Sequence, residues 1–389
     1  MSSKIRLETL GQLSHIEMGQ APSSEYVSDR HTDKAAAFIQ GNAEFTDTYP
    51  NAQLWCSRPA KLARVGDSLI SVRAPVGALN RADAPYCIGR GLAAVHFTRI
   101  DPTFGHYQLA LRSRELQRLA QGSTFDAIGS KELKALIFAV PGAESQRKIA
   151  EILDTLDQQI RLQTTYLAKL ELIEQGVVDK VLTPNRSVRE SMRAVRLEEI
   201  ASVERGKFGH RPRNDPRYLV GAHPFIQTGD VTAANGGIIE SATQSLNERG
   251  AAVSKEFPAG TIAVTIAANI ADTAILGRPM YFPDSIVGVT VYPPNVTRYV
   301  GLVIRSAKRH LESRAPQSAQ KNINLQDLRP LSLLLPDSDT QAKIAATYEG
   351  VSLTLRREWL VLEKLKILKQ GLMTDLLTGR MSEHAEDAS

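Results

Sequence analysis

The feature of this sequence that most constrains its fold is a long stretch that occurs twice. The first copy covers residues 146–183 and the second covers residues 336–380. The copies align without a gap, at an offset given by the prolines that precede them, 336 − 141 = 195. Self-similarity at a long fixed period indicates a fold built from two related halves. The residues that recur are Pro141/Pro336, Gln146/Gln341, Lys148/Lys343, Ile149/Ile344, Ala150/Ala345, Arg161/Arg356, Leu167/Leu362, Lys169/Lys364, Leu170/Leu365, Gln175/Gln370, Gly176/Gly371, Leu182/Leu377 and Thr183/Thr378.

Each copy has the apolar spacing of one long helix. Apolar residues follow one another in steps of four and three, which makes an a/d seam. No proline lies inside either stretch, and some 35 helical residues would make a rod about 50 Å long. The seam is interrupted at the same two places in both copies, at Gln163/Glu358 and at Glu174/Lys369. The seam residues are Ile149, Leu153, Leu156, Ile160, Leu167, Leu170, Val177 and Val181, and then Ile344, Tyr348, Val351, Leu355, Leu362, Leu365, Leu372 and Leu376.

A helix of this length cannot bury an apolar stripe alone, because most helix stability comes from packing. We therefore predict that the two helices pair as an antiparallel coiled coil. Two similar halves can then be related by a pseudo-two-fold axis, as in a fused homodimer. The alternatives are that each helix packs on its own domain or on an outside partner.

The rest of the chain divides into two globular domains, residues 1–145 and 195–335, each followed by a long helix. Residues 184–194 would form a short linker, and the acidic end at residues 381–389 would be a disordered tail. Short β-branched runs separated by Gly, Pro, Asn and Asp predict a mixed α/β (α+β) fold for each domain. A helix is predicted before each long helix, from Phe104, Tyr107, Leu111 and Leu116 in the first domain and from Tyr299, Val303 and Leu311 in the second.

The two domains repeat each other less clearly than the helices do. Three short segments of the first domain match segments of the second, so the scaffold is duplicated while the surface it presents has diverged. Such divergence suits a reader of two different half-sites on one ligand. The matched segments are Arg6–Leu10 with Arg196–Ile200, Phe38–Gln40 with Phe225–Gln227, and Gly66–Val72 with Gly260–Ile266.

Composition excludes several classes of protein. The net charge of +5 favours an anionic partner, though only weakly. Cys56 and Cys87 lack the spacing of a zinc site or a disulfide framework. The N-terminus has no apolar core of a signal peptide, and no stretch of about 18 apolar residues is present. We expect a soluble, cytoplasmic protein.

Motifs of catalysis are also absent. No Walker A loop is present, so nucleotide hydrolysis is not expected. The nearest approach to an adenine-methyltransferase motif is Asp83–Tyr86, which lacks the second proline, and Gly89–Gly91 is too short for a cofactor loop and is predicted to be an ordinary turn. The eight histidines form no ligand set or triad that the sequence supports. We therefore predict a non-catalytic chain and keep a fused methyltransferase or nuclease domain as an alternative.

Basic and polar residues gather in loops, where they could contact DNA. Arg and Lys neutralise phosphates, and Arg, Asn and Gln can read base edges. Residues 206–213 are predicted to be a flexible cationic loop with one aromatic residue, Phe208. Any single candidate could instead be solvated surface. The predicted DNA contacts are Arg58, Lys61, Arg73, Arg81, Arg90, Ser123 and Thr124 in the first domain, and Lys207, His210, Arg211, Arg213, Gln320, Lys321 and Asn322 in the second.

The order, duplication and spacing of these motifs resemble the specificity (S) subunit of type I restriction–modification systems. The resemblance covers nearly the whole chain. It is carried by Gln146-x-Lys148-Ile149-Ala150 and its twin Gln341-x-Lys343-Ile344-Ala345, and by Gly19–Pro22, Arg73–Gly77 and Pro224–Asp230.

The resemblance implies two target recognition domains, each reading one half of a bipartite DNA site, with the helices as a ruler between them. It implies two methyltransferase subunits that dock on this chain and methylate adenine with S-adenosylmethionine. It also implies that two motor/nuclease subunits, which use ATP and Mg²⁺, can join. This chain itself would have no active site and no cofactor.

Physical dimensions agree with a ruler, since DNA repeats its groove every ~34 Å and the helices would span about 50 Å. The competing hypothesis from a different class is a coiled-coil scaffold for protein assembly, whose domains bind protein. Phosphate contacts give a steep salt dependence that a scaffold would lack.

Overall fold

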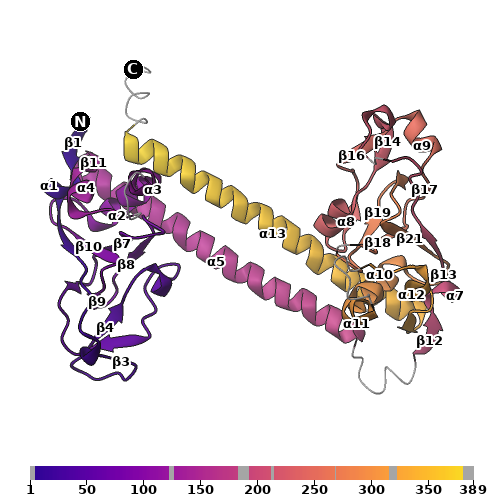
Figure 1. Ribbon diagram of the computed structural model, residues 1–389, viewed down its shortest axis with the longest axis horizontal. Coiled ribbons are helices and arrows are strands. Elements are labelled where there is room, and N and C mark those ends of the chain that lie inside the picture. Colours follow the sequence, from indigo (N-terminus) through magenta and orange to yellow (C-terminus); the bar gives the residue numbers. More distant parts are fainter. Residues whose placement is uncertain are drawn as a thin grey trace. The chain divides into compact units, whose positions relative to one another are not determined.

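The computed structural model describes residues 5–121, 127–182, 192–211, 214–267, 269–314 and 322–379. The chain divides into two compact units (Figure 1). Unit 1 comprises Met1–Thr164 and Val361–Ser389, and unit 2 comprises Thr165–Leu360. Each unit therefore contains one globular domain and a part of both long helices.

Unit 1 carries three small sheets. Their strand orders are β1-β11, β2-β10-β7-β8 and β3-β5-β4-β9-β6. Neighbouring strands run antiparallel, except that β4 and β9 run parallel. The elements that precede the long helix are β1 (Arg6–Thr9), α1 (Leu10–Leu13), β2 (Ser14–Met18), η1 (Ser24–Tyr26), β3 (Val27–Ser28), β4 (Ala36–Ile39), η2 (Asn42–Glu44), β5 (Leu54–Cys56), β6 (Leu62–Ala63), β7 (Ser68–Ser71), β8 (Leu79–Arg81), β9 (Tyr86–Ile88), β10 (Leu92–Phe97), α2 (Pro102–Leu111), α3 (Ser113–Gln121), α4 (Ser130–Ala135) and β11 (Ile137–Val140).

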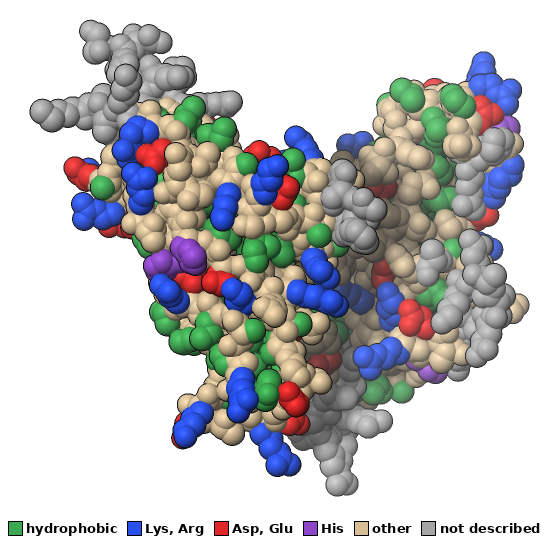
Figure 2. All heavy atoms as spheres, turned by 60° about the vertical axis from the view of Figure 1, so that its left-hand side comes forward, with side chains coloured by type: hydrophobic (Ala, Val, Ile, Leu, Met, Phe, Trp, Pro, Cys, Tyr) green, Lys and Arg blue, Asp and Glu red, His purple; other side chains and the backbone are tan. Residues whose placement is uncertain are grey.

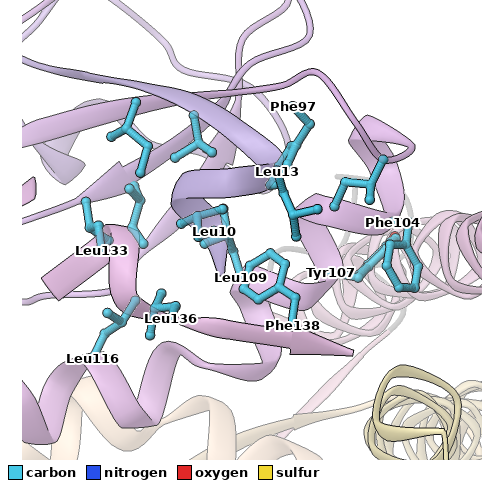
Figure 3. Packing of buried hydrophobic residues seen from close by; sticks show 14 of the residues in the cluster. Leu10, Leu13, Phe97, Phe104, Tyr107, Leu109, Leu116, Leu133, Leu136 and Phe138 are labelled. Atoms are coloured by element: carbon cyan, nitrogen blue, oxygen red, sulfur yellow. The ribbon is translucent and has the colours of Figure 1, made fainter. Parts of the chain in front are cut away.

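The core of unit 1 joins the sheet β2-β10-β7-β8 to helices α1 to α4 (Figure 3). Leu10, Leu13, Phe104 and Phe138 are fully buried in it. Helix α2 is well started, because the side chain of Asp101 accepts a hydrogen bond from the backbone N–H of Phe104 and a proline follows at the first helical position. Residues of both long helices belong to the same cluster, namely Ile149, Ala150, Leu153 and Leu377.

Unit 2 repeats this plan, also with sheets of two, four and five strands. The strand orders are β12-β22, β13-β21-β18-β19-β15 and β16-β14-β20-β17. The pairs β14–β20 and β15–β19 are parallel. The elements are β12 (Arg193–Arg196), α7 (Leu197–Ile200), β13 (Ala201–Arg205), η3 (Pro216–Tyr218), β14 (Leu219–Phe225), α8 (Thr228–Ala234), β15 (Ile238–Ile239), β16 (Gln244–Leu246), α9 (Glu248–Ala252), β17 (Glu256–Phe257), β18 (Ile262–Thr265), β19 (Thr273–Leu276), β20 (Met280–Tyr281), β21 (Ile286–Val291), α10 (Thr297–Ser306), α11 (Lys308–Arg314), α12 (Leu325–Leu328) and β22 (Ser332–Leu335).

The duplicated stretches form two long helices, α5 (Ala143–Leu182) and α13 (Ser338–Thr378). Helix α5 begins three residues before the predicted start, and α13 begins two residues after it. The strand β12 begins at Arg193, inside the segment predicted as linker. The predicted tail and residues 184–191 of the linker lie outside the described residues.

The two helices run antiparallel within each unit. In unit 1, residues 149–153 of α5 share a cluster with residues 372–377 of α13, and Asp157 pairs with Lys369. In unit 2, Glu174 hydrogen-bonds to Ser352. The seam predicted from the sequence is the side that packs, since every predicted seam residue whose side chain the structure describes is buried or half-buried. No helix among the described residues is long and apolar enough to cross a membrane.

Equivalent elements of the two units confirm most of the matched segments. Helices α2 and α10 start at the same offset as the repeated prolines, since 297 − 102 = 195. Strands β4 and β14, which contain the matched Phe38 and Phe225, each end in a parallel pairing. Strands β7 and β18 are fully buried, and a glycine with positive φ precedes each.

One matched segment is wrong in register by three residues. The sequence pairs Arg6–Leu10 with Arg196–Ile200, and so pairs Leu7 with Leu197. Leu7 lies on strand β1 and is 74% exposed, whereas Leu197 starts helix α7 and is fully buried. The structural equivalent of Leu197 is Leu10, the first residue of α1. The sequence alignment followed the shared Arg-Leu-Glu tripeptide. The correct register depends on which leucine is buried, and the sequence alone does not show burial.

Candidate nucleic-acid interface

The recurring glutamine fixes each long helix to its domain. The amide oxygen of Gln146 accepts a hydrogen bond from the backbone N–H of Asp101 at 2.9 Å, and its amide nitrogen donates to the carbonyl of Pro141 at 2.8 Å. Gln341 makes the same two bonds, with Val296 and Pro336, at 2.9 Å each. Both glutamines are nearly fully buried. The motif that carries the family resemblance is therefore a joint between the presenting domain and its helix.

A recurring glycine fixes the loop at the end of strand β2 or β13. Gly19 donates to the carbonyl of Leu92, and Gly206 donates to the carbonyl of Ile286, both at 2.8 Å. A Cβ atom at Gly19 would lie 2.1 Å from the carbonyl oxygen of Gly89. Only glycine allows this close approach of two backbones, so these loops hold the same position in both domains.

Two predicted contacts of unit 1, Arg73 and Arg90, are exposed on neighbouring loops. Arg73 follows strand β7, and Arg90 lies between strands β9 and β10. The loops are joined by a hydrogen bond of 2.9 Å from the N–H of Val72 to the carbonyl of Gly91. Figure 2 shows Lys and Arg side chains spread over the visible face among acidic and apolar side chains. The fold thus brings onto adjacent loops two arginines that are well separated in the sequence.

Arg58 and Lys61 lie on the loop between β5 and β6. The guanidinium of Arg58 lies 5.0 Å from the centre of the Tyr26 ring and donates to the Tyr26 hydroxyl. Lys61 forms an ion pair with Glu17, and its hydrogen bond lowers the pKa of that carboxyl. Both residues thus have a partner within the unit, and as DNA contacts they stay predictions.

Arg81 faces the long helix. Its guanidinium donates to Asp154 of α5 at 2.9 Å, and the Tyr107 hydroxyl lies 2.7 Å from both Asp154 and Asp157. Burial opposes the ionisation of Asp154, but the hydrogen bonds from Tyr107 and Arg81 outweigh it, so its pKa is lowered. These residues line a hollow of about 400 Å³. Arg81 therefore has a structural role at the joint, and its role as a DNA contact stays a prediction.

In unit 2 the predicted flexible loop after strand β13 is held by several contacts. Phe208 is 2% exposed and packs against Phe225, so it is unavailable to stack on a base. His210 stacks on the Tyr218 ring at 4.1 Å, and Arg211 donates to Asp284 at 3.0 Å. The prediction of flexibility is wrong for the described part of this loop, because an apolar anchor and ion pairs order it.

Lys207 and Asn322 are exposed. Lys207 corresponds to Gln20 of unit 1, since Lys207 donates its backbone N–H to the carbonyl of Phe282 after β20, and Gln20 donates to that of Ile88 at the end of β9. Asn322 forms a β-bridge with Ala267. The remaining predicted contacts lie outside the described residues; they are Ser123, Thr124, Arg213, Gln320 and Lys321.

Comparison of equivalent positions in the two units shows which charged residues occur in both domains and which occur in only one. Strands β7 and β18 start at an offset of 262 − 68 = 194, which makes Lys255 the equivalent of Lys61. Lys255 pairs with Glu204 as Lys61 pairs with Glu17. Sequence reasoning missed this duplicated pair, although an alignment on the buried strands β7 and β18 places both lysines at the same position, since 68 − 61 = 262 − 255 = 7.

Two exposed arginines of unit 1 have no basic equivalent in unit 2. The same offset places Ala267 at the position of Arg73 and Asp284 at the position of Arg90. Both positions lie at the ends of buried strands that the two domains share. The surface has therefore diverged in charge where the framework has not.

Two segments considered for chemistry have structural roles. The Tyr86 hydroxyl donates to Asp83 at 2.7 Å, and burial raises the pKa of this tyrosine. Cys56 and Cys87 are buried free thiols, and burial raises the pKa of Cys87 to about 12. Among the described residues, no group of His, Cys, Asp and Glu is arranged to hold a metal ion.

Similarity to known proteins follows the same two-fold plan. Residues 6–172 and 190–356 each match the family described as the type I restriction modification DNA specificity domain. A putative type I restriction enzyme MjaX specificity subunit from Methanocaldococcus jannaschii is 35% identical over 170 residues, which cover 43% of this chain and 40% of that protein. The matched part thus spans well under half of that relative.

Solved structures share the fold across nearly the whole chain. A type I restriction–modification S subunit from M. genitalium matches with a TM-score of 0.69 at 13% identity, covering 96% of both chains. A chain from a structure describing complex assembly and conformational transition of the type I R-M system matches with a TM-score of 0.58 at 15% identity, covering 96% of this chain and 97% of that one. With two matched segments that together cover most of its residues, this chain belongs to the type I restriction modification DNA specificity family.

Proposed function

We propose that this chain is the DNA specificity subunit of a type I restriction–modification complex. Each domain reads one half of a bipartite, asymmetric DNA site, and the paired helices set the length of the spacer. The spacer is then fixed in length and free in sequence.

One observation carries this proposal: the two domains share their framework and differ in the charges that they present. The glutamine joints and the glycine approaches recur, whereas Arg73 and Arg90 stand where unit 2 has Ala267 and Asp284. A protein that reads two different half-sites needs two domains that are held in the same way but carry different side chains on their DNA-facing surfaces. Arginine side chains can contact guanine edges or phosphates, and an acidic side chain cannot contact a phosphate favourably.

The chain is proposed to act through partners. Both long helices expose large apolar residues outside their seam, for example Leu162 and Leu172 on α5 and Ile367 on α13, which are 64%, 73% and 69% exposed. Exposed apolar residues on a helix suit the docking of partner helices. We propose two methyltransferase subunits as these partners, with two motor/nuclease subunits joining them.

The chemistry is proposed to lie in those partners. They would bind S-adenosylmethionine for adenine methylation, and ATP with Mg²⁺ for cleavage, while this chain binds none of these. Crosslinking of labelled S-adenosylmethionine to the isolated chain tests this point. Labelling of the isolated chain would overturn it.

The decisive experiment is long-read detection of N6-methyladenine in source cells with and without this chain. One bipartite motif should disappear on deletion and return on complementation. A motif that persists without the chain would refute the proposal. Binding of the assembled complex to that motif should also weaken steeply with salt, as phosphate contacts require.

A further inference from the structure

The seam between the long helices contains a polar pair in each unit. In unit 1, the ammonium of Lys369 on α13 lies 2.5 Å from the carboxylate of Asp157 on α5. Both side chains are 24% exposed. In unit 2, the hydroxyl of Ser352 on α13 hydrogen-bonds to the carboxylate of Glu174 on α5, and Ser352 is nearly buried.

These pairs are the same contact of the duplicated scaffold, seen once in each unit. The offset between the two copies makes Lys369 the equivalent of Glu174, and Ser352 the equivalent of Asp157. We call Asp157 and Ser352, which come first in their copies, the inner positions, and Glu174 and Lys369 the outer positions. Each pair therefore joins the inner position of one copy to the outer position of the other. The four positions hold four different side chains, although the Gln-Gly pair that directly follows Glu174 and Lys369 is identical in the two copies.

Because the scaffold is duplicated, each long helix could also pair with the same helix of a second molecule. Two α5 helices from different chains could pair with each other, and so could two α13 helices, through the same apolar seam. An α5–α5 pair would place Asp157 against Glu174 twice, which brings like charges together. An α13–α13 pair would leave Lys369 against Ser352 twice, without a counter-ion.

We propose that these four residues form a partner code that makes each long helix accept its heterotypic partner and reject a second copy of itself. The code favours pairing of unlike helices and disfavours the pairing of like helices from two chains. Specificity of this kind needs a repulsive element in the wrong pairing as well as an attraction in the right one, and polar residues within a coiled-coil seam are its usual carriers. The inference does not depend on DNA recognition.

The code predicts which substitutions abolish the discrimination. Asp157→Ser places serine at the inner position of both copies. Two α5–α13 pairs then contain two Ser–Lys369 and two Ser–Glu174 contacts, and so do one α5–α5 pair and one α13–α13 pair together. The double variant Asp157→Lys with Lys369→Asp keeps an ion pair in the correct pairing. It also creates two Lys–Glu pairs in the α5–α5 pairing, so discrimination is again lost.

The test is co-expression of two full-length copies of this chain that carry different affinity tags. After purification through one tag, quantitative mass spectrometry measures the share of the other. We expect both variants to co-purify with the second copy at least about tenfold more than the wild type does, since tenfold corresponds to about 1.4 kcal/mol. The control is Glu363→Ser, which removes an exposed carboxylate of α13 that pairs with Lys366 outside the seam, and which should behave as the wild type.

The double variant separates a partner code from a simple stabilising pair. A pair that only stabilises the fold would be restored by the reversed charges, and no mixing would follow. Mixing of the double variant therefore supports the code, even if Asp157→Ser fails to fold. A folded double variant that stays unmixed, or a wild type that mixes as readily as the variants, would overturn it.

Discussion

The buried glutamine that joins each long helix to its domain provides the sharpest test of the fold. Gln146→Ala removes the acceptor for the N–H of Asp101 and the donor to the carbonyl of Pro141. A buried backbone group left without a partner costs about 1–3 kcal/mol, so two cost about 2–6 kcal/mol. Asp101 and Pro141 are half-buried, and water reaches part of them, so we expect about 2–3 kcal/mol, at the low end of that range.

The loss should be confined to unit 1. The chain has two compact units, so a single global unfolding curve is not a safe measure, and hydrogen exchange by mass spectrometry resolves the units separately. Exchange should accelerate in α2 and β11 of unit 1 and stay unchanged in unit 2. Gln341→Ala should give the mirror-image result in unit 2.

The control is Gln158→Ala, which truncates an exposed glutamine of the same helix and should change stability by less than about 0.5 kcal/mol. If Gln146→Ala destabilises unit 1 no more than this control does, the joint does not hold the helix and the reasoning fails.

Of three further predictions, two concern the proposed function and one concerns a titrating group. Replacing Arg73 and Arg90 together by alanine should weaken binding at one half-site only, by about 1–3 kcal/mol for each true base contact, whereas Arg114→Ala on α3 should not; titration against sites with one half scrambled measures this. Insertion of four residues into both long helices adds about 6 Å, close to two base pairs, and should lengthen the spacer in the methylated motif. Burial and two nearby cations lower the pKa of His106 to about 3. Between the ordinary value of about 6.5 and 3, the unfolded chain binds a proton that the folded chain does not, so unit 1 should lose stability as pH falls through this window. His106→Gln should flatten that loss, as measured by hydrogen exchange of unit 1 at each pH.

The scaffold could be predicted from the sequence because its signal is repeated. The apolar seam, its interruptions and the recurring glutamine all appear twice at one offset. The pairing direction was predicted from symmetry, and the contacts within each unit confirm it. The interruptions were predicted only as breaks in the seam, because the partner of Lys369 or of Glu174 lies on the other long helix and only the folded chain brings them together.

The candidate interface could be predicted much less well. A basic residue in a loop looks the same in a sequence whether it faces solvent or an acidic neighbour. Arg81 and Arg211 are both loop or edge cations, yet each has a carboxylate partner, Asp154 and Asp284. Phe208 looked like an aromatic in a flexible loop, but it anchors a small core. Burial and long-range partners decide these cases, and neither is a local property of the sequence.

Lys61 shows how the remaining ambiguity can be resolved. It was predicted to contact DNA, but it pairs with Glu17, and the equivalent Lys255 pairs with Glu204 in unit 2. A pair that recurs where the presented surfaces differ belongs to the shared framework, so we predict that Lys61 does not bind phosphate. A phosphate contact contributes about 0.9 to the slope of log affinity against log salt concentration.

Lys61→Met should therefore leave the salt slope of the assembled complex unchanged. Its cost in stability should be about 0–1 kcal/mol, because both partners are partly exposed, with side-chain exposures of 39% and 30%. The matched comparison is the variant in which Arg73 and Arg90 are both alanine, whose slope should fall by about 1.8 if each binds one phosphate. A fall of about 0.9 for Lys61→Met would place this lysine on the DNA and would show that a charge pair shared by both domains can still serve recognition.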